Sequence, residues 1–196
     1  MRIQTLLVVA VLVVLAAMPA AVPSVADELC GPPPNECPPP PDCGGNPPGV
    51  GTPGFWENHP DTWWRCYDRS TITELPLGCT CEPCGCYDCC LVGKDTLIYW
   101  MQQPVSENKV YTMVRALVAA KLNRLAGNES ICINLAIAQA TQWMKTYGFQ
   151  DGVCGELGYC AASDDCWQDH GEELYELLDA YNNGEMCAPS RDLFDY

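Results

Sequence analysis

The sequence is short of positive charge. It has 10 Lys and Arg residues against 25 Asp and Glu residues, which gives a formal net charge of −15. Phosphate backbones and anionic membrane surfaces repel such a chain, because bringing like charges together costs free energy. The composition therefore argues against nucleic-acid binding. It leaves a solvated surface, or a loose attraction for cations.

Histidine is also scarce, which narrows the catalytic chemistry. Only His59 and His170 are present, and the chain contains no Gly-x-Ser-x-Gly, His-Glu-x-x-His, Gly-Lys-Ser/Thr or Cys-x-x-Cys-His motif. Hydrolytic triads and His-based zinc sites need a positioned imidazole with partners. We expect His59 to order a turn, and we expect no enzymatic activity and no cofactor. Glycosidase-type carboxylate pairs meet only in space and stay open, because they leave no sequence signature.

Long apolar runs are missing beyond the N-terminus. The one such run, Leu6 to Met18, has 13 residues, follows Arg2 and precedes the small-residue sequence Ser24-Val25-Ala26. It is shorter than the roughly 20 residues that a helix needs to cross a bilayer, and the layout is that of a secretory signal peptide. We expect residues 1–26 to be cleaved off. The mature protein would then have no membrane span and would be secreted or held at the cell surface.

Cysteine and proline are in excess. All 15 cysteines follow residue 26, at a density typical of disulfide-rich secreted chains. An odd count means that at least one cysteine is free or pairs with another molecule, so a disulfide-linked homo-oligomer is one expectation. Proline fills nine of the 17 positions from Pro32 to Pro48. Such a run favours polyproline II, which indicates that residues 27–53 form a semi-rigid spacer.

From Gly54 onward the pattern is mainly helical. Apolar residues recur at three- and four-residue spacing, which predicts helices over 95–103, 106–125 and 131–147. A fourth helix is expected to begin with a capping box from Asp169 to Glu172 and to end near Gly184. No convincing alternating strand is visible, and residues 66–90 are interpreted as a Cys-rich loop. The predicted fold class is mainly α: a small disulfide-stapled domain of about four helices over residues 54–196.

The Cys-rich loop is the strongest candidate site. Thiolates spaced Cys-x-Cys and Cys-x-x-Cys can surround a tetrahedral Zn²⁺ or Cu⁺ ion, and Cys81-Glu82-Pro83-Cys84 could form a redox pair. Disulfides are favoured over both, because export places the chain in an oxidising space. The candidate metal ligands are Cys79, Cys81, Cys84, Cys86, Cys89 and Cys90.

Two weaker signals lie elsewhere in the chain. Acidic side chains crowd residues 164–173, and carboxylate oxygens suit Ca²⁺, although the spacing does not match an EF-hand loop. Asn128-Glu129-Ser130 is an N-glycosylation sequon. The carboxylates concerned are Asp164, Asp165, Asp169, Glu172 and Glu173.

Three segments together resemble a group of uncharacterised bacterial secreted proteins. The segment from Gly54 to Trp63, Gly-Phe-Trp-Glu-Asn-His-Pro-Asp-Thr-Trp, is similar to their G-[YF]-W-K-N-H-P-x-x-W signature. Residues 118–123, Val-Ala-Ala-Lys-Leu-Asn, resemble I-A-A-K-L-N on a central helix of these proteins. Residues 177–184, Leu-Leu-Asp-Ala-Tyr-Asn-Asn-Gly, resemble their C-terminal L-L-D-x-Y-N-N-G.

The resemblance implies an extracellular domain and brings no enzymatic activity with it. Glu57 stands where the signature has Lys, so a role tied to that Lys is not expected here. The leading hypothesis is a secreted or cell-surface, non-enzymatic structural or interaction domain with a protein or cell-surface partner. Trp56, Trp63 and Trp64 would form either its contact surface or part of its core. The alternative is an extracellular Zn- or Cu-binding protein that uses the cluster from Cys79 to Cys90.

Overall fold

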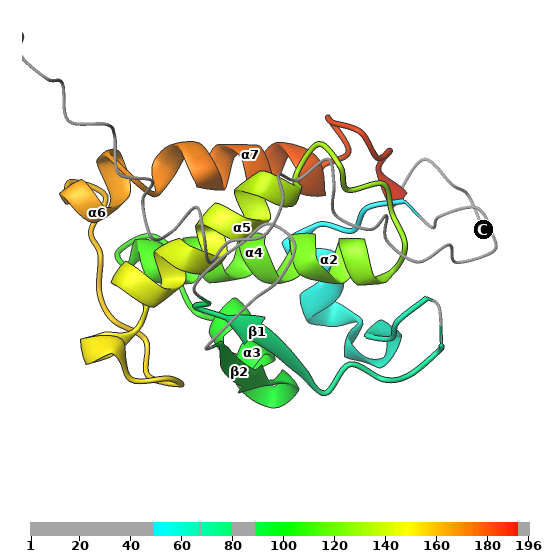
Figure 1. The fold of residues 1–196 in the computed structure, drawn as a ribbon, viewed down its shortest axis with the longest axis horizontal. Coiled ribbons are helices and arrows are strands. Elements are labelled where there is room, and N and C mark those ends of the chain that lie inside the picture. The colour runs from blue at the N-terminus through cyan, green and yellow to red at the C-terminus, as the bar shows by residue number, and fades with distance from the viewer. Residues whose placement is uncertain (1–48, 67, 80–88, 192–196) are drawn as a thin grey trace, which may run out of the picture.

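The computed structural model describes residues 49–66, 68–79 and 89–191. The expected signal peptide and most of the expected spacer lie outside these residues. The described part is mainly α, as predicted (Figure 1). Its elements are α2 (Pro53–Asn58), η2 (Pro60–Thr62), β1 (Glu74–Leu77), β2 (Cys90–Gly93), α3 (Lys94–Met101), α4 (Lys109–Leu125), α5 (Asn134–Trp143), η3 (Met144–Gly148), η4 (Gln150–Gly152), α6 (Asp165–Gln168) and α7 (Glu172–Asn182).

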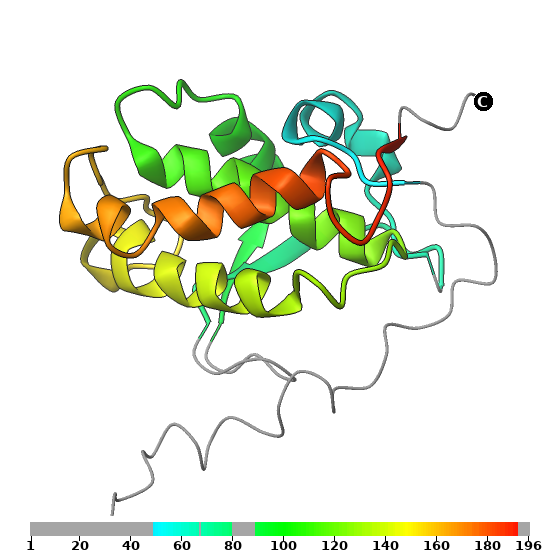
Figure 2. The same cartoon turned by 90° about the horizontal axis from the view of Figure 1, so that it is seen from above.

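Helix α4 is the centre of the molecule. It packs against α2, α3, α5 and α7, and α7 and the β1–β2 hairpin lie on opposite sides of it (Figure 1). Helices α5 and α7 run alongside each other, as Figure 2 shows. Most of α4 is buried, because it combines the predicted apolar stripe with small residues such as Ala116, Ala119 and Ala120 on its other faces. A helix that is apolar nearly all round belongs in a core rather than on a surface.

The predicted helices are all present, and most of their ends are shorter than predicted. Three of them, α3, α4 and α5, begin or end within a few residues of the expected positions. Asn108 caps α4, because its side chain accepts a hydrogen bond from the Val110 amide. The third predicted helix ends as one π-helical turn, η3. The aromatic entry at residue 54, expected as a turn, forms the short helix α2, with Pro53 in its first turn and Thr52 as its cap.

The interpretation of residues 66–90 as a loop, and of the chain as lacking strands, is corrected by a short hairpin. Strands β1 and β2 pair antiparallel, with Leu75 opposite Val92 and Leu77 opposite Cys90. These four side chains face the core. Each strand has only four residues and β1 contains Pro76, so the period-2 pattern is too short to stand out in the sequence.

The expected capping box at the start of α7 is also wrong. The residue that caps α7 is Gly171, and no side chain bonds to its first turn. The reason is that helical turns of the preceding segment run directly into α7. The Gly171 amide donates to the Trp167 carbonyl at 2.8 Å, and the Gly171 carbonyl accepts from Tyr175 at 3.0 Å. The start of α7 is therefore joined to the preceding turn by backbone hydrogen bonds at Gly171, without a side-chain cap from Asp169.

The two ends of the described part are joined. Val50 is buried and forms a parallel bridge with Ser190, so packing begins four residues before Gly54, the predicted start of the domain. Gly184 makes this approach possible. Its φ is +77°, and a Cβ atom at this position would collide with the backbone nitrogen of Ser190. Glycine is therefore required where α7 ends and the chain turns back.

Disulfides tie distant parts of this core together. Cys90–Cys154 links the hairpin to the segment after η4, across 64 residues of sequence. Cys132–Cys187 links the start of the α5 region to the segment after α7, across 55 residues. Within residues 49–66, 68–79 and 89–191, no helix is long and apolar enough to cross a membrane.

Candidate functional site

The three segments that carry the resemblance meet inside the protein at Asn123. This side chain lies on α4 and is completely buried. Its Oδ1 accepts hydrogen bonds from the Gly51 amide at 2.7 Å and from the Trp56 indole at 2.9 Å. Its Nδ2 donates to the Gly51 carbonyl and to Asn182 Oδ1, both at 2.9 Å. All four hydrogen-bonding positions of the amide are thus filled.

The network continues from Asn123 into the neighbouring elements. Asn182 on α7 donates to the Ala116 carbonyl of α4 at 2.9 Å. The Trp63 indole donates to the Trp56 carbonyl at 2.9 Å. Trp56 and Trp63 are 2% and 0% exposed, so of the two roles considered for these rings, they have the core role. Asn123, Asn182 and the two indoles therefore hold α2, α4 and α7 in register and are closed to solvent.

The two histidines are used locally. The His59 ring stacks on Phe55 with ring centres 4.4 Å apart, and its Nδ1 lies 2.8 Å from the Phe55 carbonyl. This agrees with the expected role in ordering a turn. His170 is exposed and stacks on Tyr147, with ring centres 5.6 Å apart. Each imidazole thus packs on an aromatic ring, and within the described residues neither forms an ion pair with a carboxylate.

Three of the six candidate metal ligands are disulfide-bonded. Cys79 bonds to Cys89, and Cys90 bonds to Cys154. A disulfide sulfur is not a thiolate and does not supply the ligand that Zn²⁺ or Cu⁺ needs. The other three, Cys81, Cys84 and Cys86, lie outside the described residues, so the metal hypothesis for the complete cluster stays a prediction. Among the residues that the structure does describe, no three His, Cys, Asp or Glu side chains gather into a metal site.

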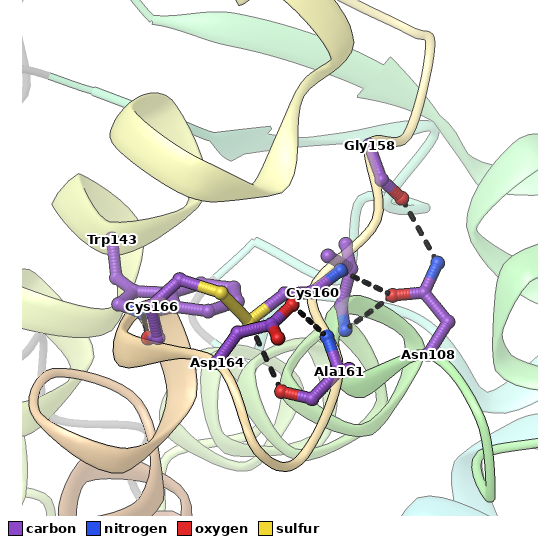
Figure 3. Close-up of a disulfide and its surroundings, with 8 residues drawn as sticks. Asn108, Trp143, Gly158, Cys160, Ala161, Asp164 and Cys166 are labelled. Atoms are coloured by element: carbon purple, nitrogen blue, oxygen red, sulfur yellow. Dashed lines mark hydrogen bonds between the residues drawn. A yellow bond between two sulfur atoms is a disulfide. The ribbon is translucent and has the colours of Figure 1, made fainter.

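The acidic loop considered for Ca²⁺ is organised around the disulfide Cys160–Cys166 (Figure 3). Asn108 fixes one side of the loop, because it donates to the Gly158 carbonyl at 2.9 Å and accepts from the Cys160 amide at 3.2 Å. Asp164 accepts from the Ala161 amide at 2.9 Å. The Asp164 carboxylate thus closes a turn of its own loop, and the described carboxylates here do not converge on one point.

An open pocket lies beside the Asn123 network, where α2, α4 and α7 meet. Its volume is about 280 Å³. Helix α7 contributes one acidic and one aromatic residue, α4 contributes one cation, and the start of α2 contributes two further residues. The lining residues are Pro53, Gly54, Val105, Thr112, Arg115, Ala116, Tyr175 and Asp179.

The pocket lining and its ion pair contain two carboxylates, Glu57 and Asp179, and one cation, Arg115. Arg115 is paired with Glu57 at 3.2 Å, and the two side chains are 29% and 19% exposed. Glu57, which stands where the signature has Lys, thus neutralises the one cation among these lining residues. Burial raises the pKa of the Tyr175 phenol, the nearby Asp179 carboxylate adds to this, and Arg115 opposes it. The phenol therefore stays neutral at physiological pH.

The pocket lining was missed by sequence reasoning. Arg115 and Asp179 lie 64 positions apart in the sequence, and neither belongs to a spacing pattern of known chemistry. The one signal in the sequence was indirect: Gly54 and Asp179 both lie in segments that carry the resemblance. A pocket of this size suits one side chain or a small polar ligand. Comparison of the chain with family models, with curated proteins and with solved structures finds no match.

The glycosylation sequon is inaccessible in the fold. Asn128 is 0% exposed, and its Nδ2, the atom to which a glycan would attach, donates to the Asn123 carbonyl at 3.1 Å. The next residue is also held, because the Glu129 carbonyl accepts from the Tyr181 hydroxyl at 2.9 Å. A glycan at Asn128 would break the loop that joins α4 to α5.

We therefore expect the folded protein to carry no glycan on Asn128, even when a glycosylating secretory host makes it. Molecules that are modified before folding should be retained by the cell. Ser130→Ala removes the sequon at little cost, since the Ser130 hydroxyl has no hydrogen-bond partner among the described residues. The secreted yield should rise for Ser130→Ala and stay unchanged for Ser163→Ala, an exposed serine. Mass spectrometry of secreted protein that shows a glycan on Asn128 would contradict this.

Proposed function

We propose that the chain works outside the cytoplasm, secreted or at the cell surface, as a non-enzymatic structural and interaction domain. The observation that carries this proposal is the state of its cysteines. All nine cysteines in the described residues are disulfide-bonded, and two of the bonds close long loops across the core. Such a set of disulfides persists in oxidising surroundings and is rare in a reducing cytosol.

The burial of the polar signature residues in the core supports the proposal that the domain is non-enzymatic. Asn123, Asn182 and the two tryptophans satisfy one another inside the core. Their arrangement makes a rigid support rather than a reactive centre, because every donor and acceptor of Asn123 is already bonded. Exposed large apolar side chains then remain for contacts with a partner, among them Ile131 and Tyr159 at 69% and 67% exposure.

Two features of the sequence support export and assembly. Residues 1–26 have the layout of a signal peptide, and the three ordered segments resemble secreted proteins. The cysteine count is odd, so at least one thiol has no partner within a single chain. Because the nine described cysteines are bonded, a disulfide to a second molecule would use one of the others.

Export and oxidation can be tested on the full chain made in a cell that secretes it. We expect a product in the medium or on the cell surface that begins at Asp27. Its intact mass should show few alkylated thiols unless a reductant is added first. A full-length product that stays inside the cell with most thiols open to alkylation would refute the proposal. Zinc and copper are measured on the same sample, and a stoichiometric metal would favour the alternative centred on the cluster from Cys79 to Cys90.

Assembly is tested on the same material by electrophoresis with and without reductant. The proposal expects a species of at least twice the chain mass that collapses to one band on reduction, or a mixed disulfide with a partner. The control is protein alkylated at the moment of cell harvest, which prevents new disulfides from forming during work-up. A single monomeric band under both conditions would remove the covalent assembly from the proposal.

A further inference from the structure

The pocket between α2, α4 and α7 has an excess of negative charge in and around its lining. Arg115 contributes +1, Asp179 contributes −1, and Glu57 at 3.2 Å from Arg115 contributes −1, so the group as a whole carries −1. Helix α7, which forms one wall, has four carboxylates and no cation: Glu172, Glu173, Glu176 and Asp179. The chain as a whole is at −15, and such a field attracts cationic partners and raises their local concentration.

An anion fits this pocket less well. It would have to displace Glu57 from Arg115 and would face Asp179 on the other wall, and like charges at such distances cost free energy. A cation faces the Asp179 carboxylate, and the repulsion from Arg115 is offset by Glu57 at 3.2 Å. Within the described part of the chain, the hydrogen bonds to Asp179 go to its backbone carbonyl and not to its carboxylate. The carboxylate is thus available to a ligand.

The rest of the lining suits a planar cation on an apolar stem. Tyr175 is half-buried, lines the pocket and packs against Trp167 with ring centres 5.7 Å apart. A guanidinium stacks favourably on such an aromatic ring. Val105 and Pro53 provide apolar surface for the methylene groups of a long side chain. The volume of about 280 Å³ is enough for one such side chain and too small for a folded element.

We infer that this pocket receives a positively charged side chain, arginine in the first place, from a partner protein, with Asp179 as the anionic contact and Tyr175 as the stacking surface. The inference rests on the proposed interaction function and names the chemistry of its partner. Gly54, the first residue of the first signature segment, also lines the pocket, so that segment would lie beside the bound side chain.

The test uses N-acetyl-arginine amide as the probe, in which the guanidinium is the only charge. Its uncharged isostere, N-acetyl-citrulline amide, is the matched control ligand. Titration of the oxidised, isotope-labelled full mature chain is followed by amide NMR shifts. We expect weak saturable binding that perturbs amides around residues 53–54, 112–116 and 175–179. The citrulline compound should bind roughly tenfold less tightly, because it lacks the charge-assisted hydrogen bond.

Two variants on α7 separate this site from general charge attraction. Asp179→Asn keeps the shape and should weaken binding of the arginine probe by about tenfold. Glu176→Gln makes the same change of net charge at an exposed position on the same helix, outside the lining, and should change affinity by less than about twofold. Unaltered thermal unfolding shows that both variants fold.

Three results would overturn the inference: equal binding of the citrulline compound, equal effects of the two variants, or saturable binding of N-acetyl-aspartate methylamide in place of the arginine probe. The last result would assign the pocket to an anion held by Arg115. These failures are distinct from failure of the proposed function. An exported, oxidised protein that engages its partner through another face would keep its binding in Asp179→Asn.

Discussion

Asn123→Leu is expected to lower the free energy of unfolding by about 3–5 kcal/mol. Leucine has nearly the same volume and keeps the helix, but it removes two acceptor and two donor positions from a site with no access to water. The Trp56 indole, the Gly51 amide and the Asn182 amide oxygen would each lose a partner. Denaturant unfolding followed by tryptophan fluorescence measures the change, because two tryptophans lie in the network.

The matched control is Asn183→Leu. Asn183 is exposed and follows Asn182 directly, and its side chain donates to the Asp179 carbonyl at the surface of α7. This substitution should change the free energy of unfolding by no more than about 0.5 kcal/mol. If Asn123→Leu costs no more than Asn183→Leu, then the hydrogen bonds of Asn123 do not hold α2, α4 and α7 together, and the three segments are not the structural support that their contacts indicate.

Removing the disulfide Cys90–Cys154 with two alanines is expected to cost about 4 kcal/mol, since it closes a loop of 64 residues. A crosslink of this length removes much of the conformational freedom of the unfolded chain, and its loss gives that freedom back. Both cysteines are changed together so that no new thiol can exchange with the remaining bonds. Thermal and denaturant unfolding of the oxidised proteins give the difference.

The comparison is the pair Cys160→Ala and Cys166→Ala, which opens a loop of only six residues. By the same entropy argument its cost is about 2 kcal/mol, and Asn108 still holds the loop through Gly158 and Cys160 (Figure 3). The order of the two effects is the result that matters. A larger loss for the short loop would mean that packing around Cys160, rather than chain entropy, sets the contribution of these bonds.

The sequence predicted those parts of the fold that depend on neighbouring residues. Helix α4 could be placed because Val110, Val114, Val118 and Leu122 recur every four residues, and Gly127 follows shortly after the helix ends. The hairpin could not be placed, because four residues on each side of the Cys-rich segment are too few for an alternation to be recognised. The capping box failed because its residues are not where a helix starts afresh. The sequence Asp169 to Glu172 fits the motif, but the backbone before it is already helical, and the Gly171 amide donates to the Trp167 carbonyl.

For the candidate site, too, the sequence predicted some features and not others. Cysteine content indicated disulfides, but their pairing was open, because 15 cysteines allow many connectivities that local sequence does not distinguish. The structure pairs Cys79 with Cys89 and Cys90 with Cys154. The neighbours Cys89 and Cys90 thus bond to partners in different parts of the chain. The pocket was not predicted at all, since Arg115, Tyr175 and Asp179 share no local pattern.

By itself the sequence determined the charge, the mainly helical class, the positions of the long helices and the cysteine-rich character of the chain. These are properties of composition and of spacing within one or two helical turns. The tertiary structure alone decided that Asn123, Trp56 and Asn182 share one network, which cysteines bond, and that a pocket opens beside them. These contacts join residues 59 and 67 positions apart. They form only when the whole core packs, because burying the polar groups is favourable only when their hydrogen-bond partners are buried with them.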